Sequence, residues 1–411
     1  MKKKLLFVLL IAVALLVTLS SCKTEEGGGG EKKADSKWEL EYTLSDDGTY
    51  YAVTDILGTC PGKVVIPATH EGLPVREIAV GAFSWNSRLT EVVIPEGVTH
   101  IGKNAFAVCP KLVRVEIPDS VTSIGEFAFF SCERLTEIHI PNGVTSIGEQ
   151  TFAFCRRLVN IRIPDSVTSL GDFSFGQCEA LVNIEIPNSV TEIGLGVFCY
   201  CTSLTSIVIA EDHPNYCSVD GTLYTKDGTM LIQYALGRTD TSFSVPTGVV
   251  SIAPFAFACC TNLTEVVLSD SVLEIGKAAF ERCLNLVSVS LPQGLVVLSE
   301  QAFIHCRSLE SIVLPSGLSE LGGGAFWECS ALSSVVLPVG VTHVSRTTFL
   351  ECDNLTAFYY CGTEAEWAGI RWEYDGNEKL KDARCYYFSE TRPEGTGFFW
   401  HYDGNGNPVP W

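Results

Sequence analysis

Residues 132–155 read CERLTEIHIPNGVTSIGEQTFAFC, and the next 23 residues repeat nearly the same pattern and end on Cys178. The period runs through most of the chain and is interrupted once, between Pro187 and Pro246. Proline recurs at positions 95, 118, 141, 164, 187, 292, 315 and 338, and phenylalanine at positions 83, 106, 129, 152, 175, 198, 257, 280, 303, 326 and 349. Self-similarity at a fixed period is typical of repeat proteins, so we expect eleven coils of 23 residues.

Each part of the repeat has its own structural preference. Ile138 and Ile140 alternate with polar residues, which indicates a short strand with one buried face. Pro141 lacks the amide that a continuing ladder needs, and the Asn-Gly pair after it favours a turn. Gly148 is expected to allow a second corner before the buried Ala-Phe positions.

One coil cannot bury its own apolar face, but stacked coils can. Coils packed at strand spacing, about 4.8 Å, would align identical side chains in columns. Each buried Phe, Leu or Ile contributes about 1.5–3 kcal/mol, so stability would arise at the interfaces between neighbouring coils. The sequence therefore predicts a β-rich solenoid of short strands and turns, capped at both ends.

A cysteine occupies the same place in ten coils, three residues after the phenylalanine, and Asn86 takes that place in the first coil. We interpret these cysteines as buried free thiols, because free cysteine behaves as a small, weakly polar core residue. The ten positions are Cys109, Cys132, Cys155, Cys178, Cys201, Cys260, Cys283, Cys306, Cys329 and Cys352.

Two alternatives for these cysteines are weaker. Disulfides between adjacent coils would need a bridge dihedral that parallel Cα–Cβ vectors make hard to reach. A zinc site would need closely paired ligands, and no C-x-x-C pair is present. The sequence leaves open whether disulfides join the cysteines outside this column, which are Cys60, Cys199, Cys217, Cys259, Cys361 and Cys385.

The first 22 residues have the character of an export signal. Three lysines precede an uncharged apolar run from Leu5 to Leu19, which is too short to span a bilayer permanently. The sequence Leu19-Ser20-Ser21-Cys22 resembles a bacterial lipobox, so we expect cleavage before Cys22 and lipid attachment to it. A Gly-rich polar stretch follows and is expected to be a flexible tether. The predicted location is the bacterial cell surface, with the membrane contacted only through the lipid.

The charge of the chain disfavours anionic partners. Without Lys2, Lys3 and Lys4, the mature chain has 25 basic and 48 acidic residues. Nucleic acids and anionic membrane surfaces are bound through concentrated Lys and Arg, so neither is an expected partner.

The stretches IPDSVTSIGEFAFFSC and LTEIHIPNGVTSIG resemble the BspA-like subclass of bacterial leucine-rich repeats, from about Val65 to Cys361. The resemblance implies a right-handed leucine-rich repeat coil, in which Asn or Cys at a buried corner satisfies neighbouring backbone groups. Members of this family are typically surface-attached or secreted proteins implicated in adhesion to host proteins and to other cells. The resemblance therefore implies a surface lipoprotein whose ligand is set by its surface and not by its fold.

The breaks in the repeat predict the order of domains. This order is a signal peptide (1–21), a lipid anchor and flexible linker (22–37), an N-terminal cap and first strand (38–76), a first repeat block (77–209), a β-hairpin insertion (210–245), a second repeat block (246–360) and an aromatic C-terminal cap (361–411). The insertion is expected to project from the solenoid as small hairpins at its Asp-Gly turns. Its Asp212, Asp220 and Asp227 fit turn positions better than a calcium loop.

Four tryptophans, at positions 367, 372, 400 and 411, lie in the last segment. Aromatic residues at this density can form a platform on which sugars stack. Covering the exposed core at the end of the stack is the simpler use, and we favour it.

Catalysis is not expected. The seven histidines are scattered, most acidic residues recur at outward or turn positions, and neither a phosphate loop nor a nucleophile elbow is present. We accordingly expect no enzyme activity and no cofactor.

The outward strand positions change character along the chain. In the first half they are mostly charged, at Glu91, Arg114, Glu116, Glu137, His139, Arg162 and Glu185. In the second half one column reads Val267, Ser290, Val313, Val336 and Tyr359, beside Ser288, Ser311, Ser334 and Ala357. If this face is open to solvent, the second-half strip is a plausible contact surface for a protein. The alternative is that such residues simply suit a sheet surface.

The sequence thus predicts a monomeric, non-catalytic recognition or adhesion protein that binds host or bacterial surface proteins. Two alternatives remain: carbohydrate binding by the aromatic C-terminal segment, and a structural role in the cell envelope.

Overall fold

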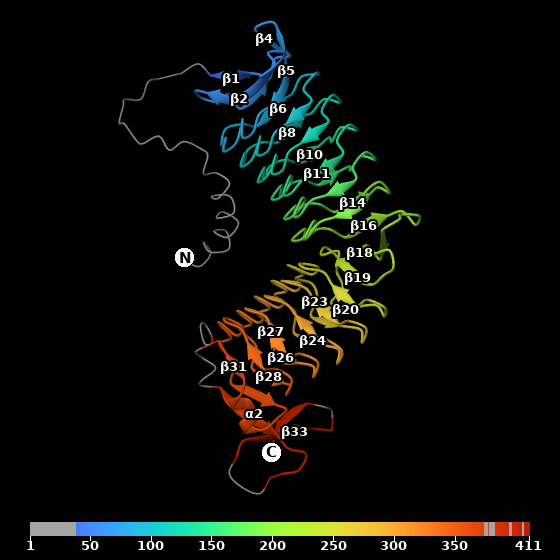
Figure 1. The fold of residues 1–411 in the computed structure, drawn as a ribbon, viewed down its shortest axis with the longest axis vertical. Coiled ribbons are helices and arrows are strands. Elements are labelled where there is room, and N and C mark those ends of the chain that lie inside the picture. Colours follow the sequence, from blue (N-terminus) through green and yellow to red (C-terminus); the bar gives the residue numbers. More distant parts are fainter. Residues whose placement is uncertain (1–37, 374–376, 378–382, 394–396, 405–406) are drawn as a thin grey trace, which may run out of the picture. The chain divides into compact units, whose positions relative to one another are not determined.

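The computed structural model describes residues 38–373, 377, 383–393, 397–404 and 407–411. The signal peptide, Cys22 and the linker, all expected within residues 1–37, lie outside the described residues. Residues Trp38–Trp411 form one compact unit in which coils follow one another in a stack (Figure 1). No helix in the described part of the chain has both the length and the apolar character to cross a bilayer.

The strand before each proline forms what we call the first strand face. Neighbouring strands pair in parallel with partners 23 residues apart, as Glu91 does with Arg114, so equivalent side chains line up in columns. In the first block the strands are β3 (Lys63–Val65), β6 (Glu91–Val93), β8 (Arg114–Glu116), β10 (Glu137–Ile138), β12 (Asn160–Ile161), β14 (Asn183–Ile186) and β16 (Ser206–Ile209). In the second block they are β20 (Ser242–Ser244), β22 (Glu265–Val267), β24 (Ser288–Ser290), β26 (Ser311–Val313), β28 (Ser334–Leu337) and β30 (Ala357–Tyr360).

A second, shorter strand follows the turn in each coil and builds the second strand face. It pairs in the same way, as His100 does with Ser123. Its members in the first block are β7 (His100–Ile101), β9 (Ser123–Ile124), β11 (Ser146–Ile147), β13 (Ser169–Leu170) and β15 (Glu192–Ile193). In the second block they are β21 (Ser251–Ile252), β23 (Glu274–Ile275), β25 (Val297–Leu298), β27 (Glu320–Leu321) and β29 (His343–Val344). The predicted β-solenoid with a 23-residue repeat is therefore confirmed.

The Ala-Phe segments form a third side, the turn face, which the sequence did not specify. Here the residues two before and two after each phenylalanine have left-handed backbones, as at Asn104 (φ 57°) and Val108 (φ 58°) around Phe106. The amides of Asn104, Phe106 and Val108 donate to carbonyls of the next coil at 2.7–3.0 Å. These bonds offset a conformation that costs an L-residue about 1–2 kcal/mol.

A glycine follows most of the second-face strands, and at several of them it is required by close packing and not by a corner. A Cβ at Gly125 would lie 2.5 Å from the Lys103 nitrogen, and one at Gly171 would lie 2.6 Å from the Glu149 nitrogen. Neither glycine has a positive φ. At these glycines consecutive coils therefore approach so closely that a Cβ would require a shift, whereas Ala253, Ser299 and Ser345 occupy the equivalent position in other coils.

Adjacent glycines allow this explanation to be tested. We expect Gly322→Ala to destabilise the protein by about 1–3 kcal/mol, because the new Cβ would lie 2.6 Å from the Glu300 nitrogen. Gly323→Ala is the matched control, since its nearest neighbour would be 3.5 Å away. The control should be neutral or stabilising by up to about 1 kcal/mol. Thermal unfolding of both variants decides the matter, and equal melting temperatures would contradict the packing explanation.

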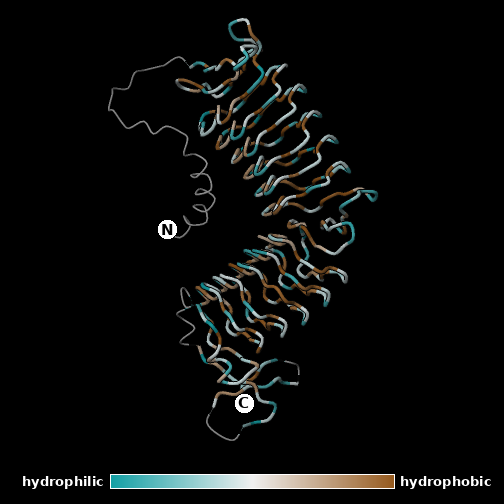
Figure 2. The backbone as a smooth tube through the Cα atoms, viewed as in Figure 1, coloured by the Kyte–Doolittle hydropathy of each residue, from teal (hydrophilic) through white to brown (hydrophobic). Residues whose placement is uncertain are grey.

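The core is a set of stacked columns, and apolar and polar residues alternate along the successive coils (Figure 2). The phenylalanine rings are buried and lie nearly parallel, with neighbouring centroids 4.8–5.7 Å apart. They form two runs, from Phe83 to Phe198 and from Phe257 to Phe349.

The insertion belongs to the stack and does not project from it as expected. Its strands β17 (Tyr216–Val219), β18 (Thr222–Thr225) and β19 (Met230–Gln233) pair antiparallel, but β19 also pairs in parallel with β21 of the second strand face. Tyr234 then takes the place of a phenylalanine, with its ring 5.2 Å from that of Phe257. The hydroxyl of Tyr216 accepts a hydrogen bond from the Ile193 amide, where another coil would otherwise continue the ladder.

The aspartates of the insertion serve its turns. Asp227 accepts hydrogen bonds from Thr225 and Thr229 of its own turn, and Asp212 accepts one from Asn188. Across the described residues, no group of three or more His, Cys, Asp or Glu side chains is placed to hold a metal ion.

Additional elements lie at both ends of the stack. At the N-terminal end these are β1 (Glu39–Leu44), β2 (Tyr51–Leu57), β4 (Thr69–His70) and β5 (Leu73–Ile78), with β2 and β5 leading into the second strand face. At the C-terminal end they are α2 (Glu364–Ala368), β31 (Arg371–Trp372), β32 (Arg384–Phe388), β33 (Phe399–Tyr402) and β34 (Pro408–Pro410). Strand β32 extends the first strand face beyond β30, and β31 extends the second face beyond β29.

Candidate functional site

The repeated cysteines lie in the interior, and all ten are buried free thiols. Nine of them donate through Sγ to the carbonyl of the phenylalanine 26 residues earlier, at 3.0–3.3 Å, as Cys155 does to Phe129. Burial raises the pKa of Cys155 to about 12, so the thiol stays neutral. Asn86 uses its side-chain oxygen differently and accepts from the amides of Arg88 and Leu89. These cysteines tie neighbouring coils together and offer no reactive surface.

The cysteines outside the column are also free among the described residues. Cys60 and Cys199 are buried, while Cys217, Cys259, Cys361 and Cys385 are partly exposed. Cys22 lies outside the described residues.

The predicted contact strip of the second block is shorter than expected. Val267 is 39% exposed, Val313 is 42% exposed, and Ser290 between them is also exposed. Val336 is only 2% exposed, so its assignment to the exposed strip is wrong. In register it pairs with Tyr359, whose ring stacks on that of Tyr386, so the strip here meets the aromatic C-terminal elements. Tyr359 itself is half-buried.

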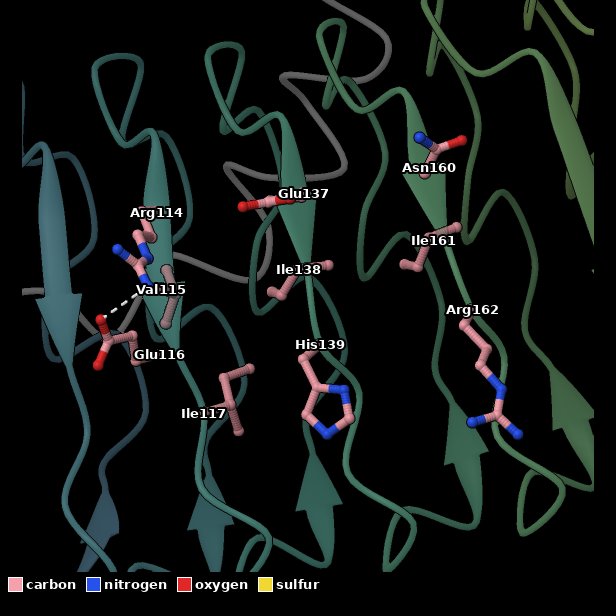
Figure 3. A pocket seen from close by; sticks show the side chains of 10 residues that line it. All are labelled: Arg114, Val115, Glu116, Ile117, Glu137, Ile138, His139, Asn160, Ile161 and Arg162. Carbon is pink, nitrogen blue, oxygen red and sulfur yellow. Dashed lines mark ion pairs between the residues drawn. The ribbon is translucent and has the colours of Figure 1, made fainter.

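The first strand face of the first block carries a groove of about 470 Å³, which we call the charged groove. Figure 3 shows its side chains on three consecutive coils, at β8, β10 and β12. The floor consists of buried aliphatic side chains, and charged or polar side chains stand above it. The floor residues are Val115, Ile117, Ile138 and Ile161, and the upper residues are Arg114, Glu116, Glu137, His139, Asn160 and Arg162.

The backbone ladder is open along the charged groove. In several other coils of this face, the amide before the proline position donates to the next coil, as Ile94 does to Glu116 and Leu314 does to Val336. No such bond joins Ile117 to His139 or Ile140 to Arg162. Strand β10 pairs with β12, but this pair belongs to a sheet separate from those of β8 and β14. The same bond is also missing after Ile163 and after Leu291, so the groove lies on one of the stretches where the strand ladder of this face is interrupted.

The charges of the groove are weakly held by their own neighbours. Arg114 lies 3.1 Å from Glu116, His139 lies 3.5 Å from Asp119, and the Arg162–Asp165 pair is longer still. The side chains in all three pairs are well exposed to solvent. Exposed pairs contribute about 0–1 kcal/mol, so a ligand can displace them at low cost.

Comparison with known proteins identifies the family. The model described as BspA type leucine rich repeat region matches residues 124–218 and 236–356, in six copies. The chain belongs to the BspA-type leucine-rich repeat family. A leucine-rich cell surface protein of Faecalibacterium prausnitzii A2-165 is 32% identical, with a TM-score of 0.68, and the match covers 83% of this chain and 98% of that one. No curated protein matches the chain.

Two more distant structures share the fold alone. A leucine-rich repeat protein of Eubacterium ventriosum is 23% identical, with a TM-score of 0.61, over 78% of this chain and 82% of that one. The pneumococcal vaccine antigen PcpA is 21% identical, with a TM-score of 0.64, over 85% of this chain and 92% of that one. The solenoid fold is therefore shared at low sequence identity.

The aromatic residues after the last BspA-type repeat are used mainly in packing. Trp400 is buried and donates through Nε1 to the Tyr360 carbonyl at 2.8 Å. The rings of Tyr359 and Tyr386 stack on each other at 5.3 Å, and the Arg384 guanidinium lies 4.5 Å from the centre of the Phe398 ring. Sugars bind to free ring faces, and the rings of Trp400, Tyr359 and Tyr386 are engaged by other side chains, whereas Phe398, Tyr402 and Trp411 are partly exposed.

The charged groove was not singled out by the sequence, although its outward residues were noted. A usable signal was present: three consecutive coils carry long charged or polar side chains at both outward positions. The next coil continues the pattern with Asn183 and Glu185, and outside these coils at least one of the two positions carries a small or β-branched residue, as Val93 and Val208 do.

Proposed function

We propose that this chain is a non-catalytic cell-surface recognition protein that binds other proteins through the charged groove. The BspA-type family and the F. prausnitzii cell surface protein support the surface location. The groove carries the proposal, because it combines an aliphatic floor with displaceable charges of both signs. Such a surface fits an extended polypeptide segment that carries both acidic and basic side chains.

The absence of catalysis is part of the proposal and is supported by the local chemistry. His139, the histidine of the groove, contacts the exposed Asp119 and is not oriented by a buried partner. A general base needs a positioned proton acceptor within hydrogen-bond reach of its substrate and commonly a third group that orients it.

The last part of the proposed function is attachment to the membrane through a lipid on Cys22. It would place the solenoid beyond a flexible tether, where the groove is accessible to large partners. If Cys22→Ser leaves the chain in the membrane fraction of its host, this part is wrong.

The groove is tested with a reversal of its two arginines. The probes are purified extracellular-matrix and bacterial surface proteins, and those that bind the wild type are used to test the variant. We expect Arg114→Glu/Arg162→Glu to weaken this binding by at least about tenfold. The difference between the wild type and the variant should be smaller at high salt. Binding is measured by surface plasmon resonance with residues 23–411.

Arg134→Glu/Arg157→Glu is the matched control, because it makes the same charge change at exposed positions of the same part of the stack, outside the groove. Equal losses in both double variants would contradict a role for the groove. A Val313→Arg variant that alone abolishes binding would move the site to the second-block strip. If no protein of the panel binds, the structural role in the envelope gains support.

A further inference from the structure

The two repeat blocks meet at a joint that differs from every other coil interface. The described core separates there into two large clusters, the first ending at Leu223 and the second beginning at Tyr224. The stacked rings follow the same division, since one run ends at Phe198 and the next begins at Tyr234. On the strand side, the insertion connects the blocks.

On the turn face the blocks touch directly. Phe173 of the first block packs against Phe255 of the second, with ring centroids 5.2 Å apart. Cys199, Tyr200 and Ala258 form a small buried cluster of their own, with Cys259 packed against it. Across this contact the Tyr200 hydroxyl donates to Glu281 Oε2 at 2.6 Å. On the turn face, the described residues thus join the blocks through these rings and the Tyr200–Glu281 hydrogen bond.

Glu281 is an unusual residue at its position. The residue after the column phenylalanine is small or apolar in neighbouring coils, as at Ala258 and Ile304, whereas Glu281 is 2% exposed. Its Oε1 accepts no hydrogen bond from the described residues, and Arg282 Nε lies 3.6 Å away. Burial raises the pKa of Glu281, against the opposing effects of Tyr200 and Arg282.

No other ionisable group at the joint can neutralise this carboxylate. Burial raises the pKa of Cys199, Cys259, Cys283 and Cys306, so these thiols stay neutral, and burial also raises the pKa of Tyr200. Among the described residues, the cation that acts on Glu281 is Arg282, whose guanidinium is about half exposed to solvent. An ionised Glu281 is therefore only partly compensated.

We propose that the Tyr200–Glu281 contact makes the joint between the blocks a pH-sensitive hinge. With Glu281 protonated, the joint packs without a buried charge and stays closed. With Glu281 ionised, the carboxylate gains hydration when the joint opens, so opening becomes more frequent. The pKa of Glu281 is higher in the closed joint than in water. Its contribution to closure is therefore complete at pH values below the ordinary glutamate pKa. This contribution is lost as the pH rises through the raised pKa of Glu281 in the closed joint.

Hydrogen exchange at the joint tests the hinge. The amides of residues 198–201 and 255–259 are followed in the full chain at about pH 5.5 and about pH 8.5, with rates corrected for intrinsic exchange. Protection in the wild type should fall with rising pH, by up to about tenfold for each unit by which the pKa is raised. Glu281→Gln, a neutral isostere, should keep its protection at both pH values. Residues 126–132, inside the first block, should show no pH dependence in either protein.

Glu274→Gln, an exposed change on β23, is the control and should behave as the wild type. Identical pH dependence in the wild type and in Glu281→Gln would overturn the proposal, as would a parallel loss of protection in residues 126–132. Tyr200→Phe provides a second test if Glu281→Gln does not fold. This variant removes a hydrogen bond that is stronger to the ionised carboxylate than to the neutral acid, so it should lower protection more at about pH 8.5 than at about pH 5.5. Equal losses at both pH values would contradict the hinge.

Discussion

Replacing Phe152 with alanine is expected to cost about 3–5 kcal/mol in the free energy of unfolding of its part of the stack. Phe152 is fully buried, and its ring lies 5.5 Å from that of Phe129 and 5.6 Å from that of Phe175. The alanine would leave a cavity between two stacked rings, and the hydrogen-bonded coils on either side cannot close it. Because each coil contacts only its neighbours, the damage should be local.

Two measurements together check this result. Calorimetry gives the shift in unfolding temperature, and hydrogen exchange locates the loss of protection in the coils next to residue 152. The second measurement is needed because repeat arrays do not always unfold in a single step. Phe398→Ala is the control, since Phe398 is 52% exposed and should cost far less. A loss spread evenly over both blocks would contradict a stack stabilised by neighbour contacts.

The sequence was sufficient to predict the buried columns. Ile138, Phe152 and Cys155 recur at a fixed period, and a fixed period with one apolar face leaves stacking as the means of burial. The pairing of partners 23 residues apart confirms this part of the prediction. The family was predicted from the same residues and is confirmed by the comparisons.

The turn face could not be read from the sequence. Left-handed backbones are usually marked by glycine, but residues such as Val108 and Phe154 occupy these positions here. The bonds between coils impose this conformation, and they form only when the coils are stacked. Tyr234 was missed for a related reason, because the insertion shifts the period and a tyrosine replaces the phenylalanine.

Surface properties were the least predictable. Val336 fits the outward pattern of its column, yet it is buried because the chain returns to the sheet through β32. The charged groove depends on where the strand ladder opens, and residue types alone do not specify that. A repeat pattern thus determines which side chains point inward, while exposure on the outer face depends on distant segments.

The most direct test of the stacked interior is the reactivity of its cysteines. The pKa of Cys109, Cys155, Cys201 and Cys260 is raised by burial to about 12, which leaves roughly one thiol in ten thousand ionised at about pH 8. Burial also blocks access, so reaction should require unfolding. The partly exposed Cys217, Cys259, Cys361 and Cys385 provide an internal comparison of access, because burial raises the pKa of these thiols as well.

Native protein is treated with iodoacetamide at about pH 8, and labelled peptides are identified by mass spectrometry before and after unfolding in guanidinium chloride. We expect the ten column cysteines to remain unlabelled in the native protein, while the partly exposed ones react first, and all to react after unfolding. Ready labelling of the column cysteines in the native protein would contradict the in-register stack with a dry interior.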